Sequence, residues 1–161
     1  MRKFYVMIIV LCLVMMISGC KMTTSDNTDA SANFDFTLPV GFVMEDVTDT
    51  ACSVVRDGET VGGFILTDMK VSDLTDSRSA ALLLYLENIA EGTEYFSWEG
   101  GDSEHPIQYL SQYFTDSHTQ EKREYYRVFF VRDSSVYDMW FDTELIDEDA
   151  ISEFLPIAGA E

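Results

Sequence analysis

The chain has 161 residues, of which 29 are Asp or Glu and 10 are Lys or Arg, so its formal net charge is −19 at pH 7. Nucleic acid and anionic lipid headgroups repel so acidic a protein, and we expect neither as a ligand. The length suits a single domain, and the aromatic content of 13% supports a packed core.

Residues 1–19 have the organisation of a secretory signal peptide. The positive start Met1-Arg2-Lys3 precedes the apolar run Phe4–Ile17, and this run is shorter than the roughly 20 residues that a transmembrane helix needs. The run ends in Ile17-Ser18-Gly19-Cys20, which closely resembles the lipobox of bacterial lipoproteins. Two alternatives stay open, an ordinary signal peptide with a chance cysteine and an uncleaved short anchor.

The lipobox resemblance implies that Cys20 is the first residue of the mature protein and carries a diacylglycerol thioether with palmitate-like chains. Two acyl chains hold a protein stably at a bilayer, so the expected location is the extracytoplasmic face of the cell membrane. The polar stretch Lys21–Asn33 has no apolar period and predicts a flexible tether that spans about 20 Å. Residues 20–33 thus form the lipidated cysteine and tether, and residues 34–161 form one globular domain.

The domain is predicted to begin with strands. Phe34, Phe36 and Leu38 alternate with polar residues, which predicts a half-buried strand. Next, the runs 51–56 and 59–66 flank Asp57-Gly58, a strong signal for a β-hairpin because both turn positions need positive φ. Gly62-Gly63 within the second strand indicates a bulge or a close backbone approach.

The hydrophobic period then changes to that of a helix over residues 76–91. Asp76 or Ser77 is the expected N-cap, and Gly92 can close the helix. Four apolar residues share one face of this helix: Leu82, Tyr85, Leu86 and Ile89.

Strand patterns return after the helix. Four segments qualify, separated in one place by an irregular polar stretch: residues 93–98, 109–116, 124–132 and 135–142. The last two are joined by Asp133-Ser134 and should form a hairpin. A second amphipathic helix ends the chain, with acidic residues 147–149 at its start and Pro156 near its end, and with these residues on one face: Ile151, Phe154, Leu155 and Ala158.

These elements predict an α+β fold, an antiparallel sheet of about six to seven strands covered by two amphipathic helices. The element order, the opening FTLPVGF and the closing strand-to-helix run resemble the PsbP-like α/β/α sandwich. That fold occurs in exported bacterial lipoproteins and in an extrinsic subunit of photosystem II. The resemblance implies a binding or assembly factor, and it supplies no active-site positions because the family shares no catalytic residues.

Candidate catalytic and metal-binding residues are few. His105 and His118 bracket one predicted strand, whose ends lie about 23 Å apart, so a shared metal site is not expected. Cys52 is interpreted as a buried strand residue rather than a nucleophile, and no zinc or G-x-S-x-G motif occurs. The sequence therefore predicts no catalytic residue, metal ligand or cofactor, and leaves weak calcium binding open at its acidic run: Asp142, Glu144, Asp147, Glu148 and Asp149.

The sequence favours a membrane-anchored extracytoplasmic lipoprotein that acts as a non-enzymatic binding or assembly module. Its partners would be the membrane, through the diacylglycerol on Cys20, and an unidentified envelope protein or small ligand. Two alternatives remain, an envelope hydrolase whose active site follows no motif and an acidic calcium-dependent adhesion or sensing domain. Aromatic side chains left exposed by the last strands would provide a binding platform, although core packing is their expected use.

Overall fold

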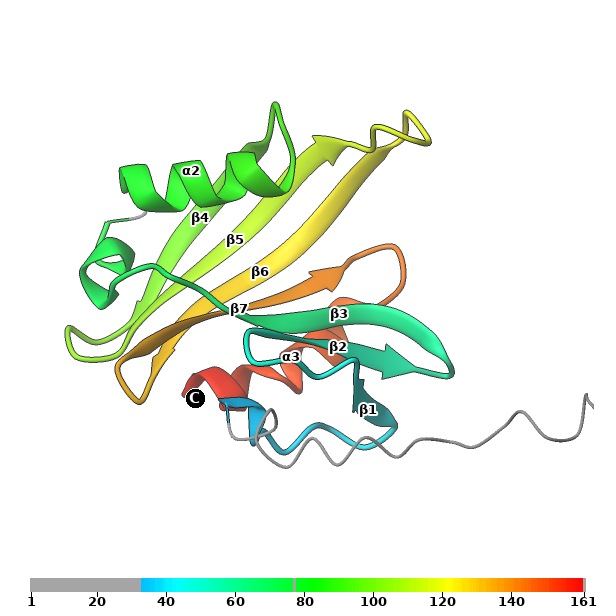
Figure 1. Ribbon diagram of the computed structural model, residues 1–161, viewed down its shortest axis with the longest axis horizontal. Coiled ribbons are helices and arrows are strands. Elements are labelled where there is room, and N and C mark those ends of the chain that lie inside the picture. Colours follow the sequence, from blue (N-terminus) through cyan, green and yellow to red (C-terminus); the bar gives the residue numbers. More distant parts are fainter. Residues whose placement is uncertain (1–32, 77, 161) are drawn as a thin grey trace, which may run out of the picture.

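The computed structural model describes residues 33–76 and 78–160 (Figure 1). The predicted signal peptide and Cys20 lie outside the described residues, as do the predicted tether up to residue 32 and Ser77. The described chain forms seven strands: β1 (Phe42–Glu45), β2 (Ala51–Arg56), β3 (Glu59–Leu66), β4 (Glu94–Gly101), β5 (Pro106–Thr115), β6 (Lys122–Arg132) and β7 (Ser135–Asp142). The helical segments are η2 (Val71–Leu74), α2 (Ala80–Ile89), α3 (Glu148–Ser152) and η3 (Leu155–Ala158).

All seven strands belong to one antiparallel sheet in the order β1-β2-β3-β7-β6-β5-β4. The predicted α+β class and the antiparallel sheet are thereby confirmed. β7, the last strand in the chain, lies in the middle of the sheet between β3 and β6. The edges are β1 and β4.

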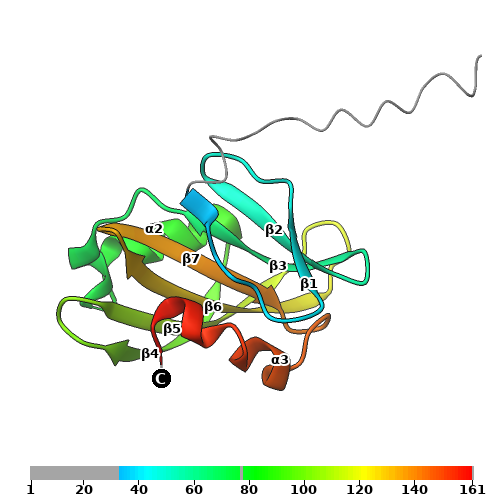
Figure 2. The same cartoon turned by 90° about the horizontal axis from the view of Figure 1, so that it is seen from below.

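Two layers cover the sheet, one on each face. Figure 1 shows α2 over β4, β5 and β6, and Figure 2 shows α3 and the C-terminal segment on the opposite face. The core beneath α2 is small and contains Leu74, Leu82, Leu86, Leu110, Phe129 and Val136. The core on the α3 side is larger, and its buried residues include Phe64, Val128, Phe130, Met139, Phe141, Ile151 and Phe154.

Both predicted hairpins are confirmed. Asp57 and Gly58 connect β2 to β3 with φ of 54° and 83°, and Asp133 and Ser134 connect β6 to β7 with φ of 51° and 63°. Two successive residues with positive φ match the right-handed twist of the flanking strands, which is why such turns join them tightly.

The predicted close approach at Gly62-Gly63 is also confirmed. A Cβ atom on Gly62 would lie 2.3 Å from the carbonyl oxygen of Trp140, and one on Gly63 would lie 2.5 Å from that of Cys52. The register of β2 against β3 shifts between Val54 and Val55, which marks a β-bulge at this point. The two glycines therefore let β3 fit between β2 and β7.

The predicted strand at Phe34–Leu38 is wrong. This segment joins no strand, and the first strand is β1, which follows Gly41. The alternating apolar side chains instead pack on the core: Phe34 is buried, and the Phe36 ring lies 4.6 Å from the Phe64 ring. Burial of aromatic rings explains the alternation without any backbone pairing.

The two predicted helices exist with different bounds. α2 begins after Ser79, whose hydroxyl accepts a hydrogen bond from the Leu82 amide at 3.1 Å, so the N-cap is neither Asp76 nor Ser77. The second helix is shorter than predicted, because α3 ends at Ser152 and the chain continues as η3 around Pro156. We call α3 and η3 the α3 layer, and this layer leaves Phe96 and Trp98 on its face of the sheet exposed.

A buried ion pair joins α2 to the sheet. Arg127 on β6 is 2% exposed, Asp138 on β7 is fully buried, and Nη1 of Arg127 donates to Oδ2 of Asp138. The Tyr85 hydroxyl of α2 donates to the same oxygen at 2.8 Å, and Nε of Arg127 donates to Oε1 of Gln112 at 2.6 Å. Burial raises the pKa of Asp138, an effect that the charge of Arg127 and the Tyr85 hydroxyl oppose.

Substituting Asp138 by Asn should lower the free energy of unfolding by about 3–5 kcal/mol, because Arg127 would stay buried without a counter-charge. Chemical denaturation followed by circular dichroism measures this loss. The D133N variant removes an exposed carboxylate from the turn between β6 and β7 and should leave the stability unchanged.

The R127M/D138L double variant removes both charges and should recover part of the stability that D138N loses. A D138N variant as stable as the wild type would contradict the role of the ion pair.

Candidate functional site

One region of the sheet stays uncovered on the α3 side. Phe96 and Trp98 on β4 are 72% and 47% exposed, and Tyr113 on β5 is 38% exposed. On the same face, Val128 and Met139 of the neighbouring strands are completely buried beneath the α3 layer. We call the uncovered part, formed by Phe96, Trp98 and Tyr113, the open face.

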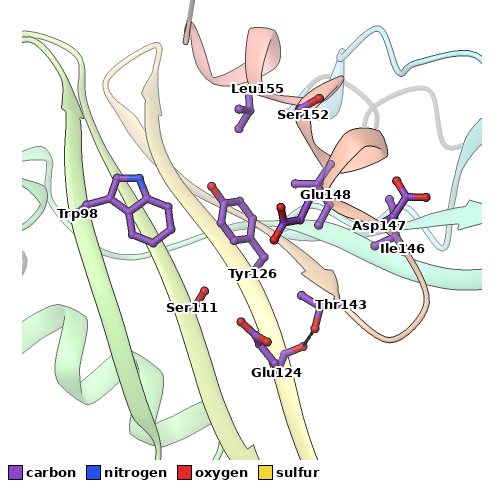
Figure 3. A pocket seen from close by; sticks show the side chains of 11 residues that line it. Trp98, Ser111, Glu124, Tyr126, Thr143, Ile146, Asp147, Glu148, Ser152 and Leu155 are labelled. Carbon is purple, nitrogen blue, oxygen red and sulfur yellow. Dashed lines mark hydrogen bonds between the residues drawn. The ribbon is translucent and has the colours of Figure 1, made fainter.

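A groove of about 630 Å³ lies between the open face and α3. Figure 3 shows Trp98 on one side of it, Tyr126 in the middle and Glu148 on the other side. Its lining residues are Trp98, Ser111, Glu124, Tyr126, Thr143, Ile146, Asp147, Glu148, Ile151, Ser152 and Leu155. A volume of this size lies within the range of roughly 300–1,000 Å³ that is typical of ligand sites.

The aromatic rings of the groove are held by their neighbours. Trp98 stacks on Tyr109, its cross-strand partner, with ring centroids 5.7 Å apart and an interplanar angle of 10°. The Trp98 ring also lies 5.9 Å from the Tyr126 ring. Burial raises the pKa of Tyr126 to about 12, so its hydroxyl is neutral at physiological pH and can donate a hydrogen bond.

The groove is acidic. It is lined by the carboxylates of Glu124, Asp147 and Glu148 and by no Lys, Arg or His side chain among the described residues. Asp147 caps α3 by accepting a hydrogen bond from the Ala150 amide at 2.8 Å, and Figure 3 shows it directed away from Tyr126, toward which Glu148 points. Glu124 accepts a hydrogen bond from the Tyr113 hydroxyl and thereby raises the pKa of Tyr113.

Glu124 is further positioned by the chain that follows β7. The hydroxyl of Thr143 donates to the backbone carbonyl of Glu124 at 3.1 Å, and the Thr143 amide donates to the same oxygen at 3.2 Å. Glu124 and Glu148 therefore bring carboxylates to the groove from two elements, β6 and α3, in addition to Asp147 at the α3 N-cap.

The structure places Cys52 in the large core, on β2, where it is buried as predicted. Burial raises the pKa of its thiol to about 11. A protonated, inaccessible thiol is a poor nucleophile, so Cys52 acts as a packing residue.

The two histidines lie in the turns before and after β5, at its opposite ends, and are not brought together. Across residues 33–76 and 78–160, no group of three or more His, Cys, Asp or Glu side chains is arranged to hold a metal ion. The acidic run considered for calcium divides between other contacts: Arg123 pairs with Asp142, and its Nε lies 3.4 Å from Oε2 of Glu144.

The sequence does not single out Phe96 or Trp98 as part of a site. The aromatic platform that it suggests lies on β6 and β7, which includes Tyr126, but most rings of these two strands are buried. A signal did exist in the alternation of Phe96 and Trp98 with polar residues on a short strand. Their exposure, however, depends on how much of the sheet the α3 layer covers. The local sequence pattern does not predict that coverage.

No protein-family model matches the chain, and a search of curated proteins found no similar sequence. Within the described residues, the structure has no helix whose length and apolar character would let it cross a membrane.

Native Cys52 should resist alkylation. With a thiol pKa of about 11, its thiolate fraction at pH 8 is about a hundredfold below that of an unfolded thiol. Labelling with iodoacetamide, mapped to Cys52 by mass spectrometry, should therefore be slow in buffer and fast in denaturant, and should accelerate between pH 9 and 11. Rapid labelling of the folded protein at pH 8 would contradict this placement.

Proposed function

We propose that the protein is a membrane-anchored extracytoplasmic lipoprotein whose domain is a non-enzymatic binding or assembly module. The observation that carries the binding role is the open face beside the groove. Monomeric proteins rarely leave large apolar patches uncovered, because each exposed ring forgoes burial. Phe96, Trp98 and Tyr113 gathered next to a groove of about 630 Å³ have the features of a contact surface.

The proposed anchor rests on the lipobox Ile17-Ser18-Gly19-Cys20 and on the polar tether after it. A diacylglycerol on Cys20 would hold the domain within about 20 Å of the bilayer surface. This length leaves the domain free to rotate while keeping it beside membrane-bound partners.

The position of the groove agrees with such an anchor. Asn33, the first described residue, receives a hydrogen bond at its backbone carbonyl from the Tyr137 hydroxyl, near the start of β7. Thr143, which lines the groove, directly follows the end of β7. These two points lie about 20 Å apart along the strand, so the Thr143 end of the groove is remote from the tether.

We further propose that the domain is a PsbP-like sandwich. An antiparallel sheet with α2 on one face and α3 on the other supports this assignment. The segment FTLPVGF, which contributes to the resemblance, contains no strand before Phe42. Proteins of that family are mostly binding or assembly factors, which is consistent with the role proposed for the open face.

The C20S variant tests the anchor. We expect it to lose labelling by a palmitate analogue and to leave the membrane fraction or to accumulate unprocessed, because the thioether needs the cysteine sulfur. The C52S variant is the matched control and should keep the label, since Cys52 is buried in the core. Equal labelling of C20S and wild type would contradict the anchor.

Site-specific photocrosslinking in cells tests the binding role. A photoreactive amino acid at Phe96, on the open face, should give a discrete crosslinked species. The control position is Leu84 on α2, which is 64% exposed on the opposite face and should give none. Equal products at both positions, or none at Phe96, would contradict binding through the open face.

A further inference from the structure

We propose that the groove binds an extended, arginine- or lysine-bearing segment of a partner protein. This inference rests on the proposed binding role and adds the chemistry of the partner. Three features point to this partner: the charge of the groove, the placement of its rings and the course of the surface beyond it.

The charge of the groove selects a cationic occupant. Glu124 and Glu148 contribute carboxylates, and the lining has no positive side chain among the described residues to neutralise them. A second copy of this chain, with a net charge of −19, is repelled. The chain's own tether KMTTSDNTDASAN has one lysine and two aspartates and does not complement the groove.

The rings favour the same occupant. A guanidinium or ammonium group placed over an aromatic face is attracted by the ring quadrupole, most strongly by Trp, and arginine makes such contacts more often than lysine. Trp98 and Tyr126 lie 5.9 Å apart by their ring centroids, and Glu148 points toward Tyr126 (Figure 3). A cation seated in the groove over the exposed surface of this ring pair, on the side of Glu148, would lie near the aromatic rings and a carboxylate together.

The surface continues past the groove, which favours a polypeptide over a small cation. A second hollow of about 380 Å³ is lined by Phe96 and Tyr113, each two residues along its strand from Trp98 and Ser111 of the groove. Its charged lining residues are Glu94 and Lys122, so the cationic side chain of the partner is expected in the groove, and the apolar part of the segment in this hollow. Two strand residues span about 6.6 Å, which is also the spacing of side chains on one face of an extended peptide. Because β4 is an edge strand, this surface is open on one side to an approaching segment.

The test uses the full-length lipidated protein in non-ionic detergent and a fluorescent peptide in which arginine alternates with threonine. Anisotropy titrations compare it with the same peptide carrying glutamine in place of arginine, and with arginine amide as a small cation. We expect the arginine peptide to bind more tightly than both, with an affinity that falls as salt rises.

The E124Q/E148Q variant should weaken binding of the arginine peptide about tenfold or more, and W98A should weaken it about fivefold or more. The matched control E45Q/E59Q removes two exposed glutamates from β1 and β3, far across the sheet order from β4, and should retain wild-type affinity. Circular dichroism confirms that each variant is folded, and W98F, which keeps a ring, should bind better than W98A.

Three outcomes would overturn the inference: equal affinity for the arginine and glutamine peptides, an unchanged affinity of E124Q/E148Q, or arginine amide binding as tightly as the peptide. Photocrosslinking separates this failure from that of the proposed function. A crosslink at Phe96 that persists in E124Q/E148Q leaves the binding module intact and refutes the cationic segment. A crosslink that disappears in this variant, but not in E45Q/E59Q, supports it.

Discussion

The buried ion pair of Arg127 and Asp138 fastens α2 to one face of the sheet. Both charged groups are shielded from water. Only their mutual contact and the hydrogen bonds around them can offset the free-energy cost of this desolvation. One of those bonds comes from Tyr85, so α2 cannot leave the sheet without exposing a hydrogen bond acceptor of the pair. Gln112 extends the network to β5 by accepting from Arg127 and donating to Thr93 Oγ1 at 3.1 Å. The network thereby holds α2 over β4, β5 and β6 (Figure 1).

The opposite face of the sheet is stabilised by apolar packing instead of an ion pair. Its core is larger and almost wholly apolar, built on aromatic contacts such as Phe141 with Phe154 at 4.8 Å. α3 is short because the chain turns into η3 at Pro156, and a proline cannot donate a hydrogen bond within a helix. The layer leaves Phe96 and Trp98 of β4 exposed, although η3 approaches the end of β4 at Gly101. The same face thus supplies both the main core and the surface that we propose for binding. A small domain can therefore provide a contact site without a second domain.

Local patterns explain which features were predictable. The hairpins at Asp57-Gly58 and Asp133-Ser134 follow from turn residues that tolerate positive φ, and the buried face of α2 follows from its period. The ion pair also follows from the second hairpin, because the register of that hairpin pairs Phe129 with Asp138 and so places Asp138 beside Arg127. The central position of β7, the packing of Phe34 without a strand and the exposure of Trp98 depend on contacts between distant segments. These features cannot be predicted from any local residue pattern.

Hydrogen exchange measured by mass spectrometry tests most directly whether the ion pair fastens α2 to the sheet. In the wild-type protein, the account predicts that α2 amides exchange as slowly as those of β6 and β7, since helix and sheet open together. In the Y85F variant, which lacks the hydroxyl that reaches Asp138, α2 should lose protection while β2 and β3 keep theirs. Fast exchange of α2 in the wild-type protein, or identical α2 protection in both proteins, would contradict the account.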